Sequence, residues 1–175
     1  VPARCGRLAV AEDPDAPGGR KIELAIAVVP AISARAKEDP LFLLAGGPGQ
    51  GAQDAFVGAL GALSGVRRER DIVLLDQRGT GRSSSDGGDV IQYGTRIAMN
   101  DMDAVRAALG YERINLWGGS YGATAAQYYI RQHEDRLRSV VLDGATLLEV
   151  PVFERIAANS QAALDALFAR CAADA

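Results

Sequence analysis

One segment constrains the fold of this chain more than any other: an apolar run that leads directly into a serine flanked by glycines. Ile114-Asn115-Leu116-Trp117 has the composition of a buried strand, and Gly118-Gly119-Ser120-Tyr121-Gly122 follows it without a break. A helical pattern rich in small residues then extends from Tyr121 to about His133. The G-x-S-x-G letters alone are common, but a nucleophile elbow requires this strand–turn–helix context. We therefore predict that Ser120 is a catalytic nucleophile.

The chemistry of such a turn explains its glycines. A serine held in a strained backbone conformation projects its hydroxyl clear of the sheet. Side chains at Gly118 and Gly122 are expected to collide with the neighbouring strand and helix. The helix N-terminus beneath Ser120 favours negative charge that develops there. The alternative interpretation is a glycine-rich turn with a capping serine.

Short apolar runs alternate with helical patterns along most of the chain, which predicts one α/β domain with a mostly parallel sheet and helices on both faces. A helical pattern between Ile97 and Leu109 is expected to stop at Gly110. The other predicted strands are Arg7–Val10 and Ile22–Val29, which form a pair, and Leu41–Ala45, Ile72–Leu75 and Ser139–Gly144.

The loop Gly46-Gly47-Pro48-Gly49 follows a predicted strand and suits an oxyanion hole. A tetrahedral intermediate needs two N–H donors, and we predict that Gly47 and Tyr121 supply them. A phosphate-binding loop is the alternative, but the GK[ST] ending and the G-x-G-x-x-G spacing are both missing. No cofactor is therefore predicted.

Composition excludes several partners. A net charge of −3 with scattered Lys and Arg argues against nucleic acid, and no apolar run approaches the roughly 20 residues of a membrane span. No signal-peptide pattern is present. Cys5 and Cys171 are either two independent thiols or partners in disulfides, and their surroundings do not indicate a metal site.

The glycine-proline loop, the elbow, Asp76–Ser83 and Leu142-Asp143-Gly144 together resemble the prolyl iminopeptidase and tripeptidyl aminopeptidase family of α/β-hydrolases, from about Cys5 to the end of the chain. The resemblance implies release of short N-terminal units from peptides, or cleavage of related amides and esters. It also implies that the turn containing Asp76 is a structural brace, and that the protein is periplasmic or secreted. One departure is Ala45, where the family usually has His.

The catalytic base is missing. His133 is the single histidine, and thirteen residues along one helix place it roughly 20 Å from Ser120, so we exclude it. We expect it to interact with the C-terminus of its own helix. Asp143 ends a strand at the correct rim, but in the family the acid comes from a later strand.

The family places a helical cap after the strand that ends at Asp143. We accordingly predict that residues 1–150 form the N-terminal part of an α/β-hydrolase core, truncated after that strand, and that 151–175 begin the cap with an amphipathic helix from Val152 to Cys171. A C-terminal portion or a complementary chain is expected to supply the acid and the histidine. Whether the chain is a trimmed fragment, one chain of a nicked enzyme or a natural half stays open, and alone it is expected to be inert.

Two alternative functions remain. The same fold accommodates an esterase or lactonase, and a chain without a histidine is compatible with a non-catalytic hydrolase-like binding domain.

Overall fold

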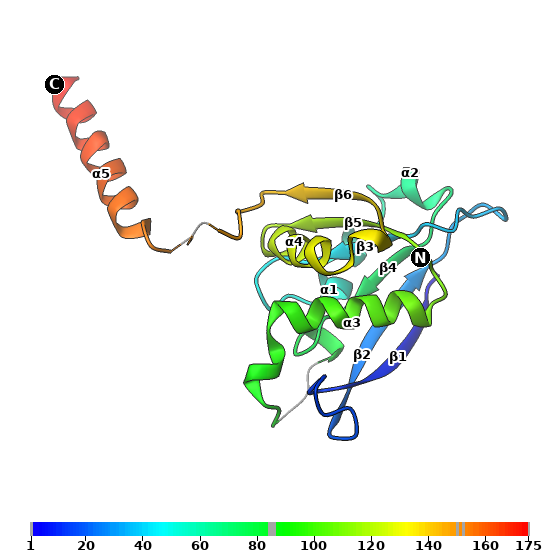
Figure 1. The fold of residues 1–175 in the computed structure, drawn as a ribbon. Helices are drawn as coiled ribbons and strands as arrows, with labels where there is room; N and C mark the ends of the chain where they lie inside the picture. The colour runs from blue at the N-terminus through cyan, green and yellow to red at the C-terminus, as the bar shows by residue number, and fades with distance from the viewer. Residues whose placement is uncertain (1, 84–86, 150, 152, 175) are drawn as a thin grey trace. The chain divides into compact units, whose positions relative to one another are not determined.

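A sheet of six strands forms the centre of residues 1–145 in the computed structural model (Figure 1). The structure describes residues 2–83, 87–149, 151 and 153–174. The strands are β1 (Arg4–Ala11), β2 (Lys21–Val29), β3 (Leu41–Leu44), β4 (Ile72–Leu75), β5 (Ile114–Gly119) and β6 (Leu137–Asp143). Their spatial order is β1-β2-β4-β3-β5-β6.

The sheet is mostly parallel, which confirms the prediction. Strands β4, β3, β5 and β6 run parallel to one another, whereas β1 pairs antiparallel with β2 and β2 with β4. The chain passes from β3 to β4 on one side and then returns across β3 to β5, so the strand order reverses at β3. In open α/β sheets, ligands bind outside the carboxyl ends of the strands at such a point.

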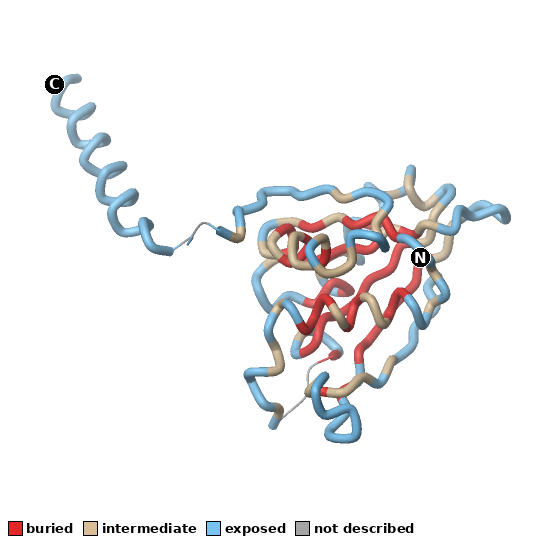
Figure 2. Tube along the Cα trace, viewed as in Figure 1, coloured by how far each residue is buried: buried red, intermediate tan, exposed pale blue. Residues whose placement is uncertain are grey.

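Helices cover both faces of the sheet, as predicted. The long helices α3 (Thr95–Ala108) and α4 (Tyr121–His133) pack against one face, and the short helix α1 (Ala52–Phe56) packs against the other. Successive residues of a strand point to opposite faces of the sheet. Phe42 and Leu44 lie in the core under α3 and α4, while Leu43 lies in a second core on the α1 face. Figure 2 shows the buried strands between these layers.

The remaining elements of residues 1–145 are short. The chain turns between strands through single helical turns, and α3 ends before Gly110, whose φ of 81° accounts for the predicted stop. These short elements are η1 (Val57–Ala59), α2 (Ser64–Arg67), η2 (Gly81–Ser83), η3 (Val90–Tyr93) and η4 (Glu134–Arg136).

Residues 146–175 form a second unit, which contains helix α5 (Ile156–Ala173). The start predicted at Val152 lies outside the described residues. Three side chains of the predicted apolar stripe, Leu164, Leu167 and Phe168, are exposed. Cys171 in this helix and Cys5 in β1 are both exposed free cysteines.

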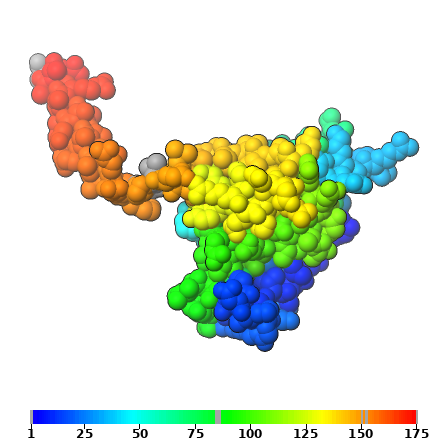
Figure 3. All heavy atoms as spheres, in the orientation of Figure 1, coloured from blue at the N-terminus to red at the C-terminus, as the bar shows by residue number. Residues whose placement is uncertain are grey.

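Strand β6 is an open edge of the sheet. Most of its residues are exposed, and Val141 and Leu142 expose 54% and 40% of their surface (Figure 2). Figure 3 shows the surface that α4 and β6 present, in yellow and pale orange. This edge thus carries exposed apolar side chains, and such an edge favours pairing with a further strand.

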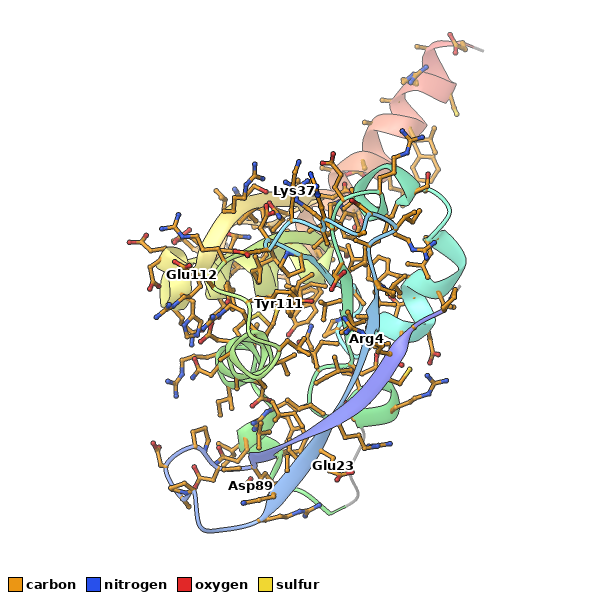
Figure 4. The ribbon with its side chains drawn as sticks, turned by 90° about the vertical axis from the view of Figure 1, so that its right-hand side faces the viewer. Arg4, Glu23, Lys37, Asp89, Tyr111 and Glu112 are labelled. Carbon is orange, nitrogen blue, oxygen red and sulfur yellow. The ribbon has the colours of Figure 1, made fainter. Side chains whose placement is uncertain are left out.

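The amino ends of the strands are held by polar contacts around Asp71, which precedes β4. Its carboxylate accepts a hydrogen bond from the Tyr111 hydroxyl at 2.7 Å and lies 3.5 Å from the Arg4 guanidinium, both labelled in Figure 4. The amide of Ala31 donates to the other oxygen at 2.8 Å. This end of the sheet is therefore occupied by structural contacts.

Candidate active site

Ser120 lies between the last residue of β5 and the first residue of α4. Its φ of 54° and ψ of −123° make it the one non-glycine residue with a positive φ in the part of the chain that the structure describes. Such a conformation costs about 1–3 kcal/mol and persists only where surrounding contacts hold it. The Ser120 amide donates to the carbonyl of Asp143 at 2.8 Å, and the Ser120 carbonyl accepts from Ala123 at 2.9 Å. These two bonds fix the turn.

The two flanking glycines permit close approach of backbone to backbone. A Cβ atom on Gly118 would lie 2.3 Å from the carbonyl oxygen of Gly122, in the first turn of α4. A Cβ on Gly122 would lie 2.2 Å from the carbonyl oxygen of Leu44, at the end of β3. Both collisions were predicted from the sequence and are confirmed.

The glycine-proline loop leaves β3 and lies directly against Ser120. A Cβ on Gly46 would be 3.4 Å from both the Gly119 oxygen and the Ser120 Cβ. Gly47 follows with a φ of 107°, a region that an L side chain rarely adopts. The structure therefore brings the predicted donor Gly47 to the same rim as Ser120.

Tyr121 is the first residue of α4, so its amide has no acceptor one turn earlier in the helix. Its side chain points to α3, where the hydroxyl and Thr95 Oγ1 are 2.7 Å apart. The hydroxyl is thus used in packing, and the backbone amide is the group available beside Ser120.

Ser120 opens into a hollow of about 540 Å³ at the carboxyl ends of the strands. One wall is aromatic: Phe56 of α1 and Trp117 of β5 meet edge to face, with ring centroids 5.5 Å apart. The lining residues are Gly46, Gln50, Ala55, Phe56, Trp117, Gly119, Ser120, Asp143 and Gly144. Phe56 and Gln50 could not be predicted from the sequence, since neither residue belongs to a recognisable motif.

Asp76 follows β4 and is used as a structural brace, as expected. It is 1% exposed, and its two oxygens accept the amides of Gln53 at 2.9 Å and Arg82 at 3.0 Å. A Cβ on Gly81 would lie 2.5 Å from this carboxylate. Asp76 therefore holds two loops together beside the site, with both of its oxygens engaged in hydrogen bonds to backbone amides.

The site thus combines a strained serine at a strand–helix turn with a glycine loop at the point where the strand order reverses. The chain also matches the model of a protein family. The model described as "alpha/beta hydrolase fold" matches residues 39–174. This chain belongs to the alpha/beta hydrolase fold family.

Among the curated relatives of this chain are peptidases. The proline iminopeptidase of Xylella fastidiosa (strain 9a5c) is 35% identical over 114 residues, which cover 62% of this chain and 33% of that protein. The serine protease Hip1 of Mycobacterium tuberculosis (strain ATCC 25618 / H37Rv) is 29% identical, over 82% of this chain and 36% of its own length. The chain thus spans about a third of the length of the curated relatives it matches.

Solved structures share the fold. The proline iminopeptidase-related protein of Thermus thermophilus has a TM-score of 0.60 and 27% identity, over 77% of this chain and 42% of that one. The proline iminopeptidase of Mycobacterium smegmatis has a TM-score of 0.61 at 22% identity, over 78% of this chain and 43% of its own length.

His133 lies at the far end of α4 from Ser120, as predicted. The expected contact with the C-terminus of its own helix is replaced by a contact with α3: Nε2 is 3.1 Å from Asn100 Oδ1. Its ring also packs against Tyr129 with centroids 4.9 Å apart. The chain has one histidine, so its 175 residues place no imidazole beside Ser120.

Other kinds of site are not evident in the described residues. Over this part of the chain, no three His, Cys, Asp or Glu side chains are grouped so that they could hold a metal ion. No helix within the same residues has the length and apolar character that crossing a membrane requires.

Proposed function

We propose that the complete protein is a serine peptidase of the aminopeptidase type, which releases short N-terminal units through an acyl-enzyme on Ser120. The observation that carries this proposal is the strained backbone of Ser120 beside the Gly46–Gly49 loop. The peptidase names of the relatives support the reaction class.

In the proposed mechanism, Ser120 Oγ attacks the carbonyl carbon of the substrate. The negative charge that develops on the carbonyl oxygen is stabilised by the amides of Gly47 and Tyr121, assisted by the N-terminus of α4. Collapse of the intermediate expels the amine and leaves an ester on Ser120, which water then hydrolyses. Acylation and deacylation both need a base. The base accepts the proton of the attacking hydroxyl or water and then gives a proton to the leaving group.

The base and its orienting acid are proposed to come from chain outside these 175 residues. Two surfaces support a contact with such a portion. One is the exposed edge of β6, and the other is an apolar hollow of about 430 Å³ beside α1 on the sheet face opposite α3 and α4. The hollow is lined by Leu41, Leu43, Phe56, Ala59, Ala62, Leu63, Val66, Arg70, Asn115, Trp117, Arg138, Ser139 and Val141.

The test uses a fluorophosphonate probe and chromogenic aminoacyl amides and esters on the complete protein. We expect Ser120 to be labelled, and the Ser120→Ala variant to lose labelling and at least about a thousandfold in kcat. The 175-residue chain alone is expected to be inert. Labelling at another residue, or turnover that survives Ser120→Ala, would contradict the proposal.

Hydrolysis of esters without hydrolysis of aminoacyl amides would instead assign the protein to the esterase alternative. A complete protein that neither labels nor turns over any of these substrates would be a binding domain. His133→Ala is the matched control, because it removes the one histidine of the chain from a position outside the site.

A further inference from the structure

A second hollow, of about 280 Å³, adjoins the glycine-proline loop and is distinct from the Ser120 hollow. Gly46 and Gln50 line both hollows, so the two meet at this loop. The wall of the second hollow also includes Tyr121, whose amide is a donor in the proposed oxyanion hole. In the proposed mechanism, the second hollow therefore begins where the substrate carbonyl is held.

The register of the sheet relates this hollow to Ser120. Gly46, Gln77 and Ser120 follow β3, β4 and β5 at the same level of the strand pairing. Neighbouring strands are about 4.8 Å apart, so the backbones of Gln77 and Ser120 are separated by about 10 Å across β3. Each residue of an extended chain advances about 3.5 Å. The reach of the two side chains and one substrate residue together bridge this interval.

Gln77 is a buried residue with an unused polar group. The residue is 7% exposed and lines the second hollow. Its backbone carbonyl accepts the amide and the hydroxyl of Thr80, at 3.0 and 2.9 Å. Its side-chain amide, in contrast, makes no hydrogen bond with any described residue. Because burial of an unpaired amide costs free energy, this group indicates a ligand that enters the hollow and pairs with it.

The one charged residue that lines this hollow, among those described, is already neutralised. Arg78 donates to both oxygens of Asp101, at 2.6 and 2.8 Å, and its remaining contacts are with backbone carbonyls. Gln77 and Gln50 add neutral amides. The described part of the wall therefore offers hydrogen bonds without an unpaired charge.

A glutamine amide is complementary to a peptide group. The amide has N–H donors and an acceptor oxygen, whereas a peptide group has one N–H and one carbonyl, so the two can form a pair of hydrogen bonds. In a substrate of an aminopeptidase, the leaving chain consists of such groups. The N-terminal unit ends in an amine that is mostly charged at neutral pH. A neutral hollow thus fits the leaving chain better than it fits the N-terminus.

We infer that the second hollow binds the leaving chain, and that the Gln77 amide pairs with the first peptide group beyond the scissile bond. This inference rests on the proposed function and adds the leaving side of its substrate. Gln77 determines specificity here and takes no part in proton transfer.

The test compares two peptides in the complete protein. Both begin with the residue that is released fastest from the chromogenic amides, followed by alanine methylamide in one and alanine dimethylamide in the other. The second peptide has a methyl group in place of the N–H that Gln77 would accept. We expect wild-type kcat/KM to be about fivefold higher for the methylamide. Gln77→Met keeps a side chain of similar length without the amide, and should reduce this ratio to about one.

Two controls make the outcome specific. Gln127→Met replaces a glutamine of α4 that lines neither hollow and donates to the Ala123 carbonyl at 3.3 Å, so the fivefold ratio should persist. The methyl ester of the same N-terminal residue has a leaving group without a peptide group. Gln77→Met should therefore leave kcat/KM for this ester within about twofold of wild type.

Other results would overturn the inference. A wild-type ratio near one, with Ser120 labelled by the probe, would remove the inference and leave the proposed function in place, and this measurement needs no variant. A ratio that persists in Gln77→Met would mean that another group recognises the N–H. An equal loss on both peptides and the ester would mean that Gln77 supports the structure of the site. If wild type hydrolyses no substrate and Ser120 is not labelled, the proposed function fails and the inference fails with it.

Discussion

Asp76 and Asp143 occupy similar places in the sheet and have opposite surroundings. Asp76 directly follows β4, and Asp143 is the last residue of β6, so both lie at the carboxyl ends of parallel strands. Asp76 is buried, and both of its oxygens are hydrogen-bonded to backbone amides. Asp143 is exposed, and its carboxylate has no partner among the described residues.

The difference in burial and hydrogen bonding shows how the same side chain can have a structural role in one place and be available to a ligand in another. A buried carboxylate must be satisfied by its own protein, because an unpaired buried charge is costly. Once both oxygens accept hydrogen bonds from the protein, the carboxylate has little remaining capacity to bind a ligand. A carboxylate at an open rim is hydrated, so a ligand can replace its water. The two aspartates should therefore respond to mutation in opposite ways.

The largest effect on stability is expected for Asp76→Ala. This change leaves the amides of Gln53 and Arg82 without their acceptor in a buried site, so we expect a loss of about 3 kcal/mol in the free energy of unfolding. Asp76→Asn keeps one acceptor oxygen and should lose about 2 kcal/mol. Urea denaturation measures both, and a loss below about 0.5 kcal/mol for Asp76→Ala would contradict its role as a brace.

Gly81→Ala should have the second largest effect. The new Cβ would meet the Asp76 carboxylate at 2.5 Å, and the φ of 47° is unfavourable for alanine, so we expect a loss of about 2 kcal/mol. Gly58→Ala, where nothing lies within 4 Å of the new Cβ, is the matched control and should change stability by less than about 0.5 kcal/mol. Combined with Asp76→Ala, Gly81→Ala should cost less than it does alone, because the clash is removed.

Asp103 on α3 carries a third carboxyl group, and its ionisation makes the stability of the folded state depend on pH. Burial raises its pKa, but hydrogen bonds from Arg106 and Tyr129 outweigh burial and hold the pKa of this carboxyl below its ordinary value. The folded state therefore favours the ionised form. Its stabilisation is fully present above the ordinary pKa of about 4, and it is lost as the pH falls through the lower folded-state pKa.

Asp103→Asn should accordingly lower the free energy of unfolding by about 1 kcal/mol at neutral pH, because the hydrogen bonds to a charged acceptor are weakened. The difference from wild type should shrink as the pH is lowered towards about 3. Urea denaturation at the two pH values measures this change. Parallel pH profiles for wild type and variant would show that Asp103 contributes no pH-dependent stability.

The smallest effect on stability is expected for Asp143→Asn, at less than about 0.5 kcal/mol, because its exposed carboxylate makes no hydrogen bond or ion pair with a described residue. Thermal and urea unfolding measure it. A large loss of stability would mean that Asp143 is structural like Asp76, and it would remove the contrast between the two aspartates.

The local parts of this site could be predicted from the sequence. Strand β5, the turn at Ser120 and the bounds of α4 follow from neighbouring residues, since an apolar run, a glycine-flanked serine and a small-residue helix are adjacent in the chain. Exclusion of His133 also needed only the rise of a helix. The contact of His133 with Asn100 could not be predicted, because it depends on how α4 packs on α3.

The sequence by itself determined that this chain is an alpha/beta hydrolase and which serine stands at its strand–helix turn, because such motifs are short and contiguous. Only the tertiary structure decided that Asp76 is buried and hydrogen-bonded, while the exposed carboxylate of Asp143 has no partner among the described residues. It also placed Phe56 of α1 against Trp117 of β5. The physical reason is that burial and pairing depend on strand order. The parallel pairing of β5 with β6 brings Asp143 to Ser120 across 23 residues of chain.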